Sequence, residues 1–467
     1  MEMIDVLVQQ RLAFLRDSPP DYDTRKARLA KLRAAVVLHR RALGEAVSAD
    51  FGNRSRHETD IMELLGILQA IDYLSKNLRR FMKPERRHVA FTYRGGKAYV
   101  AYQPKGVIGI MAPWNYPVSL MIIPLATALA AGNRAMLKPS ELTPQTSALL
   151  HKMLTAAFPV EEVAVITGGP EVGASFSKLA FDHLLFTGST SVGHMVMKAA
   201  SENLVPITLE LGGKSPAIIA QRHVNDQTLG GLVFGKLANA GQTCVAPDYA
   251  LVHEDEIEAF ITQYGRMVAR FYPQGPTSAD YTSIINERHY QRLQALIEDA
   301  RAKGARIIEV GEKPQSAKNR ERTIAPTLIL DVRDEMMVMQ EEIFGPLLPV
   351  RSWRKMEEVI SYINARPRPL ALYYFGEQDE DCRLVLASTT SGNVGINNTL
   401  MHVAQDDLPF GGIGPSGMGA YHGIEGFRSM SHAKGIFVQS RLNLPLLLRA
   451  PFGRLVDFVL SMKLGKS

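Results

Sequence analysis

Apolar residues near the N-terminus recur with the period of a helix. One stripe between residues 61 and 71 has the three- and four-residue spacing of a single helical face: Ile61, Leu64, Leu65, Leu68 and Ile71. Pro84 is expected to end this helix. Two shorter segments, 88–93 and 97–102, then flank the pair Gly95-Gly96. They predict two strands joined by a turn.

Short apolar runs alternate with helical segments over the rest of the chain. From about residue 106 to 220 the predicted strands are 106–111, 134–138, 163–167, 183–187 and 217–220. From there to about 400 they are 250–253, 306–310 and 370–375. Strands alternating with helices indicate βαβ units and parallel sheets. The pattern predicts two α/β units, followed by an irregular glycine-rich loop at 405–426.

Composition narrows the class of protein. The 467 residues are 46% hydrophobic and 21% charged, which is typical of a globular chain and excludes a disordered or fibrous one. Two cysteines cannot form a disulfide framework and favour a reducing compartment. The sequence shows neither a secretory leader nor about 18 uninterrupted apolar residues. We therefore expect a cytoplasmic protein.

Positive charge is concentrated in the C-terminal tail. Residues 441–467 hold five cations against one carboxylate, which is +4 of the chain's net charge of +6. No continuous basic face remains elsewhere, so a nucleic-acid partner is not expected. In the same tail, one apolar helical stripe lies beside cationic residues: Leu455, Phe458, Val459 and Met462, with Arg454, Lys463 and Lys466. This amphipathic stripe suits weak contact with an anionic membrane, or packing on the protein itself or on a dimer mate.

Cys244 is the first candidate for chemistry. It follows the small, glycine-containing segment Asn239-Ala-Gly-Gln-Thr. Backbone N–H groups there could lower the pKa of the thiol and later bind an oxyanion. The alternative is a small buried side chain without a chemical role. Cys382, on a predicted polar helix, is expected to be structural.

Glu210 and Asn115 are candidates for a base and a polar donor. Glu210 stands between leucines at a strand end, where desolvation would raise its pKa toward the range of a general base. A solvated carboxylate at the sheet edge is the alternative. Asn115 lies between Pro113 and Pro117 in a stiff loop. Its amide could stabilise an oxyanion, or the loop could be a structural turn.

Several motifs suit a dinucleotide. Gly188, Ser189 and Gly193 follow an apolar strand and open a helix, where free N–H groups suit a pyrophosphate. Their spacing differs from the usual G-x-G-x-x-G pattern, and many turns look similar. Lys138 and Glu141 follow another strand and could bind ribose hydroxyls, or form a solvated surface pair.

Six motifs, in this order along the chain, resemble those of the aldehyde dehydrogenase superfamily. They are Pro113-Trp-Asn, Lys138-Pro-Ser-Glu, Phe186-Thr-Gly-Ser-Thr, Leu209-Glu-Leu-Gly-Gly-Lys-Ser-Pro, Gly241-Gln-Thr-Cys and Glu342-Ile-Phe-Gly-Pro. The similarity runs from about residue 25 to 440. The ending around 421–434 resembles the class 3 and fatty-aldehyde branch. Residues 51–60 and 203–206 resemble bacterial members of it that oxidise coniferyl aldehyde.

The resemblance implies a role for each matched position. Cys244 would be the nucleophile, Glu210 the general base, and Asn115 with the Cys244 N–H the oxyanion hole. The implied cofactor residues are Lys138 and Glu141 at the adenosine ribose, Gly188, Ser189 and Gly193 at the pyrophosphate, Glu342 at the nicotinamide ribose, and Phe344 and Trp114 near the nicotinamide. No metal site is implied.

The implied fold class is α/β, in four segments. A Rossmann-like NAD-binding domain would span 1–82 and 105–211, and an α/β catalytic domain with a glycine-rich closing loop would span 212–432. A β-arm for oligomerisation, 83–104 with 433–440, would join a homodimer. Residues 441–467 would form the amphipathic basic tail.

The implied function is NAD(P)-dependent oxidation of an aldehyde to a carboxylic acid, through a cysteine thiohemiacetal and thioester. The resemblance favours a phenylpropenal such as coniferyl aldehyde, with medium- or long-chain fatty aldehydes as the alternative. Glu141 favours NAD, while NADP stays possible. Glu210 disfavours transfer to coenzyme A, and a thiol hydrolase would need a histidine partner for Cys244. A non-catalytic scaffold or binding protein on the same fold is the alternative from another class.

Overall fold

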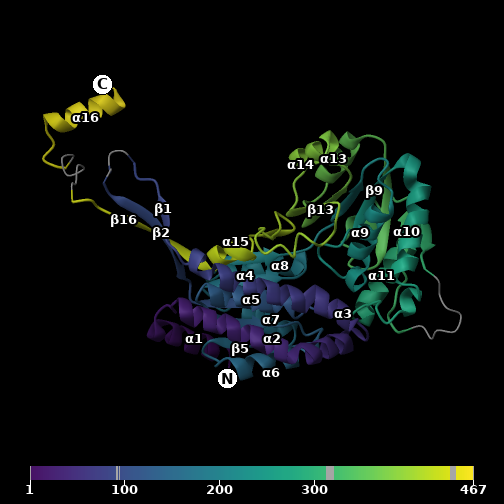
Figure 1. Ribbon diagram of the computed structural model, residues 1–467, viewed down its shortest axis with the longest axis horizontal. Coiled ribbons are helices and arrows are strands. Elements are labelled where there is room, and N and C mark those ends of the chain that lie inside the picture. Colours follow the sequence, from purple (N-terminus) through teal and green to yellow (C-terminus); the bar gives the residue numbers. More distant parts are fainter. Residues whose placement is uncertain (1, 91–92, 94, 312–319, 442–448, 466–467) are drawn as a thin grey trace.

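The computed structural model describes residues 2–90, 93, 95–311, 320–441 and 449–465. Their strands form two large sheets and a smaller one, which projects to one side as an arm (Figure 1).

The first large sheet has the strand order of a dinucleotide-binding fold. Its order is β15-β7-β6-β3-β4-β5. The strands are β3 (Val107–Met111), β4 (Arg134–Lys138), β5 (Val163–Val165), β6 (His183–Thr187), β7 (Ile207–Glu210) and β15 (Gly417–Met418). The first five are parallel, in the Rossmann order 3-2-1-4-5. In such sheets ligands bind where the order reverses, here beyond the ends of β3 and β6.

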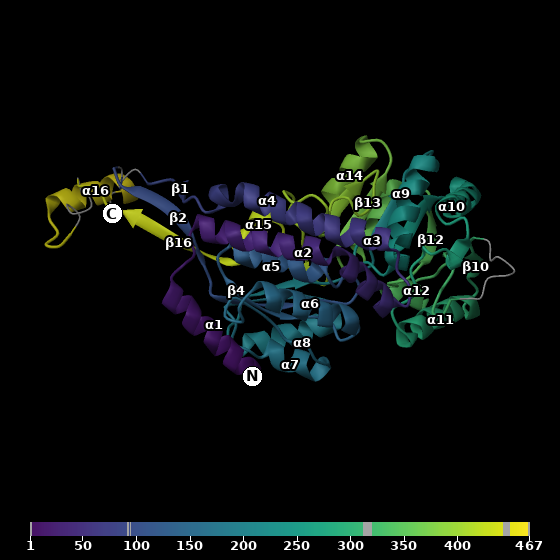
Figure 2. The same cartoon turned by 60° about the horizontal axis from the view of Figure 1, so that its bottom comes forward.

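Helices cover both faces of this sheet (Figure 2). Ile108 and Ile110 point to one face and Val107 and Met111 to the other, as the two-residue period of a strand requires. The Ile108 face carries α5 (Ser119–Ala130) and α6 (Pro144–Ala157), with α2 (Tyr22–Phe51) and α4 (Gly66–Phe81) outside them. The opposite face carries α1 (Met3–Asp17), α7 (Pro170–Ser177) and α8 (Thr190–Ser201).

The second large sheet has the order β10-β11-β12-β9-β8-β13-β14. Its strands are β8 (Pro216–Ile219), β9 (Tyr249–His253), β10 (Arg306–Glu309), β11 (Thr327–Leu330), β12 (Leu347–Trp353), β13 (Ala371–Phe375) and β14 (Asn393–Ile396). All pair in parallel except β10, which is antiparallel to β11. The helices are α9 (Asp226–Leu237), α10 (Ile257–Phe271), α11 (Glu287–Ala302), α12 (Met337–Gln340), α13 (Met356–Asn364) and α14 (Glu380–Ser388). The predicted α/β fold class is confirmed.

The arm differs from its prediction at one strand. It consists of β1 (Glu85–Arg87), β2 (Lys97–Pro104) and β16 (Ser431–Val438), with β2 in the middle. The prediction of a strand at 88–93 is wrong for residues 88–90 and 93, while 91 and 92 lie outside the described residues. The pairing strand is the charged segment before it, because an edge strand leaves such side chains solvated.

The predicted apolar stripe at 61–71 is confirmed in part: Leu64, Leu68 and Ile71 face the core, whereas Ile61 and Leu65 do not. A π-helix, η1 (Asp60–Leu65), precedes α4, and the face turned to the core is Leu64, Ile67, Ile71, Leu74, Leu78 and Phe81. Ile61 and Leu65 are 59% and 49% exposed. They line a cavity instead, which explains apolar residues outside the core.

Part of the glycine-rich segment lies on the first sheet, although the prediction placed all of 212–432 in the catalytic domain. β15 pairs with β7, and α15 (Gly423–Ser429) packs on α4 and α5. The chain therefore crosses back to the first sheet before it enters the arm.

The tail forms α16 (Arg454–Leu464), which lies at the far end of the arm in both views (Figures 1 and 2). Leu455, Phe458 and Met462 of the predicted stripe are exposed, and Val459 is partly buried. Lys466 lies outside the described residues. Within the described ranges, no helix combines the length and apolarity needed to cross a bilayer.

Candidate active site

Most of the predicted site residues gather where the two large sheets meet. Asn115, Gly188 and Glu210 follow or end β3, β6 and β7, at the carboxyl edge of the first sheet. Cys244 and Phe344 precede β9 and β12, at the amino edge of the second. One cavity of about 200 Å³ is lined by all five. The sequence prediction that these distant motifs form one site agrees with this geometry.

Cys244 is a poor thiolate in this cavity. It follows α9 and a short 3₁₀ turn, η3 (Ala238–Gly241), and is partly buried. Burial, together with the nearby carboxylates of Glu342 and Glu210, raises the pKa of its thiol to about 12. The predicted backbone N–H groups, those of Cys244 and Val245, do lower this pKa, but burial and the two carboxylates outweigh them, so the net shift is upward.

Glu210 is a buried carboxylate at the end of β7. It is 2% exposed, and neither carboxylate oxygen has a hydrogen-bond partner among the described residues. Burial raises its pKa well above the ordinary value. The predicted desolvation is confirmed, and the solvated alternative is wrong. Such a group holds a proton readily and can accept one from water.

A glycine of the closing loop supports this position. Gly417 pairs with Glu210 across the sheet, and its φ is +149°. A Cβ atom there would lie 2.4 Å from the carbonyl oxygen of Leu209. The close approach of β15 to β7 therefore requires glycine.

Asn115 is buried and connected to the loop of Cys244. Its Nδ2 donates to the carbonyl oxygen of Gln242 over 3.1 Å, two residues before the thiol. An amide nitrogen carries two hydrogens, so the second is available to an oxyanion. Its own carbonyl oxygen accepts from Asn239 and from Arg54.

Lys138 ends β4, and Glu141 lies just beyond it at a separate hollow. The Lys138 Nζ donates to the carbonyl oxygen of Pro139 over 2.8 Å and lies 3.4 Å from a Glu141 carboxylate oxygen. Glu141, Ser140 and His151 line a hollow of about 450 Å³. This hollow has acceptors and donors for a ribose.

The predicted phosphate residues begin α8. The hydroxyl of Ser189 accepts from the N–H of Val192 over 3.4 Å, and the N–H of Gly188 donates to the Glu210 carbonyl oxygen over 3.0 Å. Gly193 is buried in the first turn, where a Cβ atom would lie 2.8 Å from a Leu211 methyl carbon. Its place indicates close helix packing rather than direct contact with a ligand.

Glu342, Phe344 and Trp114 form the far wall of the 200 Å³ cavity. Burial, with Asp248 nearby, raises the pKa of Glu342 to about 8. Its carboxylate lies so close to Gly212 that a Cβ there would be 2.1 Å away. The centroids of the Phe344 and Trp114 rings are 5.4 Å apart. The backbone of Phe344 has a φ of +52°, which is unusual for a residue with so large a side chain.

A second cavity, of about 330 Å³, meets the first at Cys244. Its wall is mostly apolar and aromatic, and includes Ile61, Leu65, Tyr116, Leu120, Leu400, Met401, Phe410 and Tyr421. The thiol thus lies between this apolar cavity and the cavity that is lined by the carboxyl groups of Glu210 and Glu342.

Sequence reasoning missed most of this second wall. Its residues come from η1, α5 and the loops at 400–422, which share no motif. The one available signal was the apolar character of Ile61 and Leu65. A helical stripe of apolar residues does not distinguish a residue that lines a cavity from one in the core. Cys382 is 1% exposed in α14, in agreement with a structural role.

Comparison with known proteins agrees with this geometry. The model of the aldehyde dehydrogenase family matches residues 14–436. A Caulobacter vibrioides protein named "Probable coniferyl aldehyde dehydrogenase" is 49% identical over 97% of this chain and 94% of its own length. The substrate-bound structure of Staphylococcus aureus AldH superposes with a TM-score of 0.92 at 36% identity, covering 99% of this chain and all of that one. A Mycobacterium tuberculosis aldehyde dehydrogenase complexed with NAD⁺ gives 0.82 at 28% identity, over 92% and 89% of the two chains. The chain belongs to the aldehyde dehydrogenase family.

Proposed function

We propose that the protein oxidises an aldehyde to a carboxylic acid at Cys244. The observation that carries this proposal is the position of the thiol, where an apolar cavity meets a second cavity that is also lined by Glu210 and Asn115. The arrangement favours catalysis over a non-catalytic scaffold.

The chain's own residues account for the chemistry around the thiol. The Cys244 sulfur, once deprotonated, attacks the aldehyde carbon, and the Nδ2 of Asn115 donates to the oxyanion of the thiohemiacetal. Bound NAD(P) supplies the acceptor for the hydride that leaves this carbon. Glu210 then takes a proton from water, which hydrolyses the thioester and releases the acid.

The cofactor residues fit a dinucleotide on two observations. Glycine at 212 leaves room for the Glu342 carboxylate, and the first turn of α8 presents backbone N–H groups after Gly188 and Ser189. Trp114, Glu342 and Phe344 would hold the nicotinamide end. Lys138 and Glu141 would hold the adenosine ribose.

NAD is the proposed cofactor, because the Glu141 carboxylate repels a 2′-phosphate. Comparing kcat/KM for NAD and NADP tests this proposal, and a clear preference for NADP would contradict it. Glu141→Ala should reduce the preference for NAD over NADP. Glu202→Ala, at an exposed and distant residue, should leave this preference unchanged.

Coniferyl aldehyde is the proposed substrate. The aromatic side chains of the second cavity, Tyr116, Phe410 and Tyr421, suit a planar ring, and the most similar relative described above carries that substrate in its name. A panel of coniferyl aldehyde, cinnamaldehyde, hexanal and decanal, ranked by kcat/KM, tests the proposal. Higher kcat/KM for decanal would instead support a fatty-aldehyde enzyme.

We further propose a homodimer joined by the arm, in a cytoplasm that keeps both cysteines reduced. β16 lies at one edge of the arm sheet, where a second copy can add a strand. The exposed apolar residues of α16 suit the same partner. Reversible contact with an anionic membrane is the alternative for α16, since Arg454 and Lys463 lie beside the apolar residues.

A further inference from the structure

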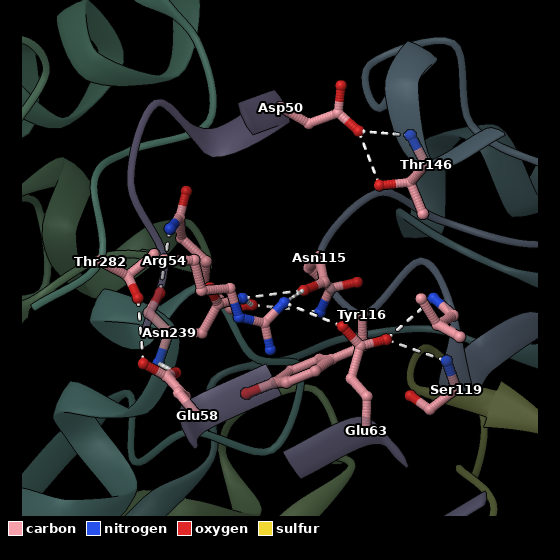
Figure 3. A network of polar contacts seen from close by, with 12 residues as sticks. Asp50, Arg54, Glu58, Glu63, Asn115, Tyr116, Ser119, Thr146, Asn239 and Thr282 are labelled. Carbon is pink, nitrogen blue, oxygen red and sulfur yellow. Dashed lines mark hydrogen bonds and ion pairs between the residues drawn. The ribbon is translucent and has the colours of Figure 1, made fainter. Parts of the chain in front are cut away.

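The segment 51–60 holds a buried arginine that the proposed reaction does not use. Arg54 is 1% exposed and follows the end of α2, in the loop before α3 (Arg56–Thr59). Figure 3 shows it pointing toward Asn115 and Glu63, at the centre of a polar network.

One nitrogen of Arg54 connects two groups. Its Nη1 donates to Glu63 Oε1 and to the carbonyl oxygen of Asn115, each over 3.1 Å. The other oxygen of Glu63 accepts from the N–H groups of Val118 and Ser119, at 2.8 and 2.9 Å. The loop that carries Asn115 is therefore tied at its carbonyl and, three residues later, at the start of α5.

A second set of bonds ties the same carbonyl to the loop of Cys244. Asn239 Nδ2 donates to the carbonyl oxygens of Asn115 and Gln242, over 2.9 and 3.1 Å. Asn239 and Ala240 both have φ near +50°. The N–H of Asn239 donates to Glu58, which also accepts from the Thr282 hydroxyl over 3.0 Å. This strained loop is held by several side chains at once.

Burial makes the pair of charges costly. The Arg54 and Glu63 side chains are both fully inaccessible, and burial raises the pKa of Glu63 while Arg54 opposes that rise. A buried ion pair contributes little net stability compared with apolar residues of the same shape. Its bonds are nevertheless directional, and here they end at the backbone of Asn115.

We infer that Arg54 is a positioning residue for the oxyanion hole, acting through the carbonyl of Asn115. By fixing that carbonyl, it holds the Asn115 amide between the Gln242 carbonyl and the space beside the Cys244 sulfur. The inference rests on the proposed function, because it gives the Asn115 amide an oxyanion to stabilise.

The first test is Arg54→Lys, measured on reactions of Cys244 that need no cofactor. Lysine keeps a positive charge beside Glu63 but lacks the planar guanidinium that reaches Asn115. In hydrolysis of a nitrophenyl ester, the thiolate adds to the carbonyl and an oxyanion forms before nitrophenolate leaves. Alkylation by iodoacetamide displaces iodide and forms no oxyanion.

We expect ester hydrolysis to fall about 10- to 100-fold in Arg54→Lys, less than when an oxyanion donor is removed outright. Alkylation of Cys244 should stay within about twofold, because it needs no such donor. Arg134→Lys is the matched control: Arg134 is also buried, but it binds Glu161 and Asp17 at the opposite edge of the first sheet. A parallel fall in both reactions of Arg54→Lys, or no fall in either, would overturn the inference.

A double-mutant cycle with Asn115→Ala tests the route of the effect. If Arg54 acts through Asn115, Arg54→Lys should slow ester hydrolysis by less than about twofold once Asn115 is alanine. Additive losses would overturn the inference and leave the proposed function intact. An Asn115→Ala enzyme as fast as the wild type would overturn both.

Discussion

The thiol of Cys244 and the carboxyls of Glu210 and Glu342 share one small, buried cavity. Burial favours the neutral form of each, and the carboxylates further oppose formation of the thiolate. When no cation is bound in the cavity, the Cys244 thiol therefore stays protonated. This state protects the thiol from oxidation, since the thiolate is the reactive form.

The resting state predicts a pH profile for the free enzyme. Alkylation of Cys244 by iodoacetamide, without cofactor, should rise about tenfold per pH unit from pH 7 to 10 without levelling, because the pKa is about 12. Glu342→Gln should raise the rate at pH 8, whereas Glu141→Gln should leave it unchanged. A plateau of the alkylation rate near pH 8 would show that the pKa of the thiol is not raised. Cys244→Ala provides the zero point, and should bind NAD while oxidising no aldehyde.

We expect replacement of Glu210 to have opposite effects on activity and on stability. Glu210→Gln should keep a pre-steady-state burst of NADH and slow the later steady rate, because hydrolysis of the thioester loses its base. The folded protein holds the Glu210 proton more tightly than the unfolded chain, whose glutamate titrates near 4.5. Wild-type stability is therefore lost as pH rises from about 4.5 toward the raised pKa of Glu210 in the folded protein, and Gln should recover it.

Thermal unfolding at pH 5 and pH 9 measures this recovery. The Tm gain of Glu210→Gln should be larger at pH 9, and the exposed Glu202→Gln should show no such difference. A gain equal at both pH values would indicate a packing effect instead of a protonation effect.

At the scale of elements, the pairing of β15 with β7 connects the closing loop to the general base. Gly417→Ala would push a methyl group against the Leu209 carbonyl and strain a φ of +149°. We expect a loss of about 1–3 kcal/mol in unfolding free energy and a lower kcat, because Glu210 is paired with residue 417.

Gly435→Ala is the matched control for this change. Gly435 lies in β16, and an added Cβ meets nothing within 4 Å. Denaturant unfolding and steady-state kinetics of both variants make the comparison. Equal behaviour of the two would show that β15 does not hold the base.

Elements with one dominant signal could be predicted from sequence, whereas those set by distant contacts could not. β4 and β6 were predicted at their observed bounds, because each has a short apolar run, typical of a buried parallel strand, between polar end residues. In α4 the predicted Leu68 and Ile71 do face the core, whereas Ile61 and Leu65 of η1 do not, since residues that line a cavity are as apolar as those of the core. Motifs located Cys244, Glu210 and Asn115, but nothing near Arg54 in sequence indicated its contact with Asn115, 61 residues away.

At the scale of the whole molecule, the arm and α16 lie apart from both large sheets (Figure 1). The apolar residues Phe452, Leu455, Phe458 and Met462 are each more than half exposed. An exposed apolar helix at the end of an extended arm suggests that something covers it.

Deleting residues 445–467 distinguishes the two candidate covers. If α16 packs on a second copy, the truncated protein should shift toward monomer by light scattering, with liposome co-sedimentation unchanged. If it lies on lipid, co-sedimentation with anionic vesicles should fall and should already be weak at high salt, because each basic residue contributes about 1 kcal/mol. If the truncated protein keeps both its oligomer mass and its co-sedimentation with vesicles, α16 has neither the dimer role nor the membrane role.

The two cavities that meet at Cys244 have Leu120 and Cys244 in common, and the loop before α5 contributes to both, but most of their other residues come from different elements. Selection can therefore act on them separately. Changes at Ile61, Met401 or Phe410 can alter which aldehyde is accepted while the dinucleotide contacts stay as they are. Cys244 thus belongs both to a cavity that can be altered and to one that can be left unchanged. This makes the protein a suitable starting point for enzymes that oxidise new aldehydes.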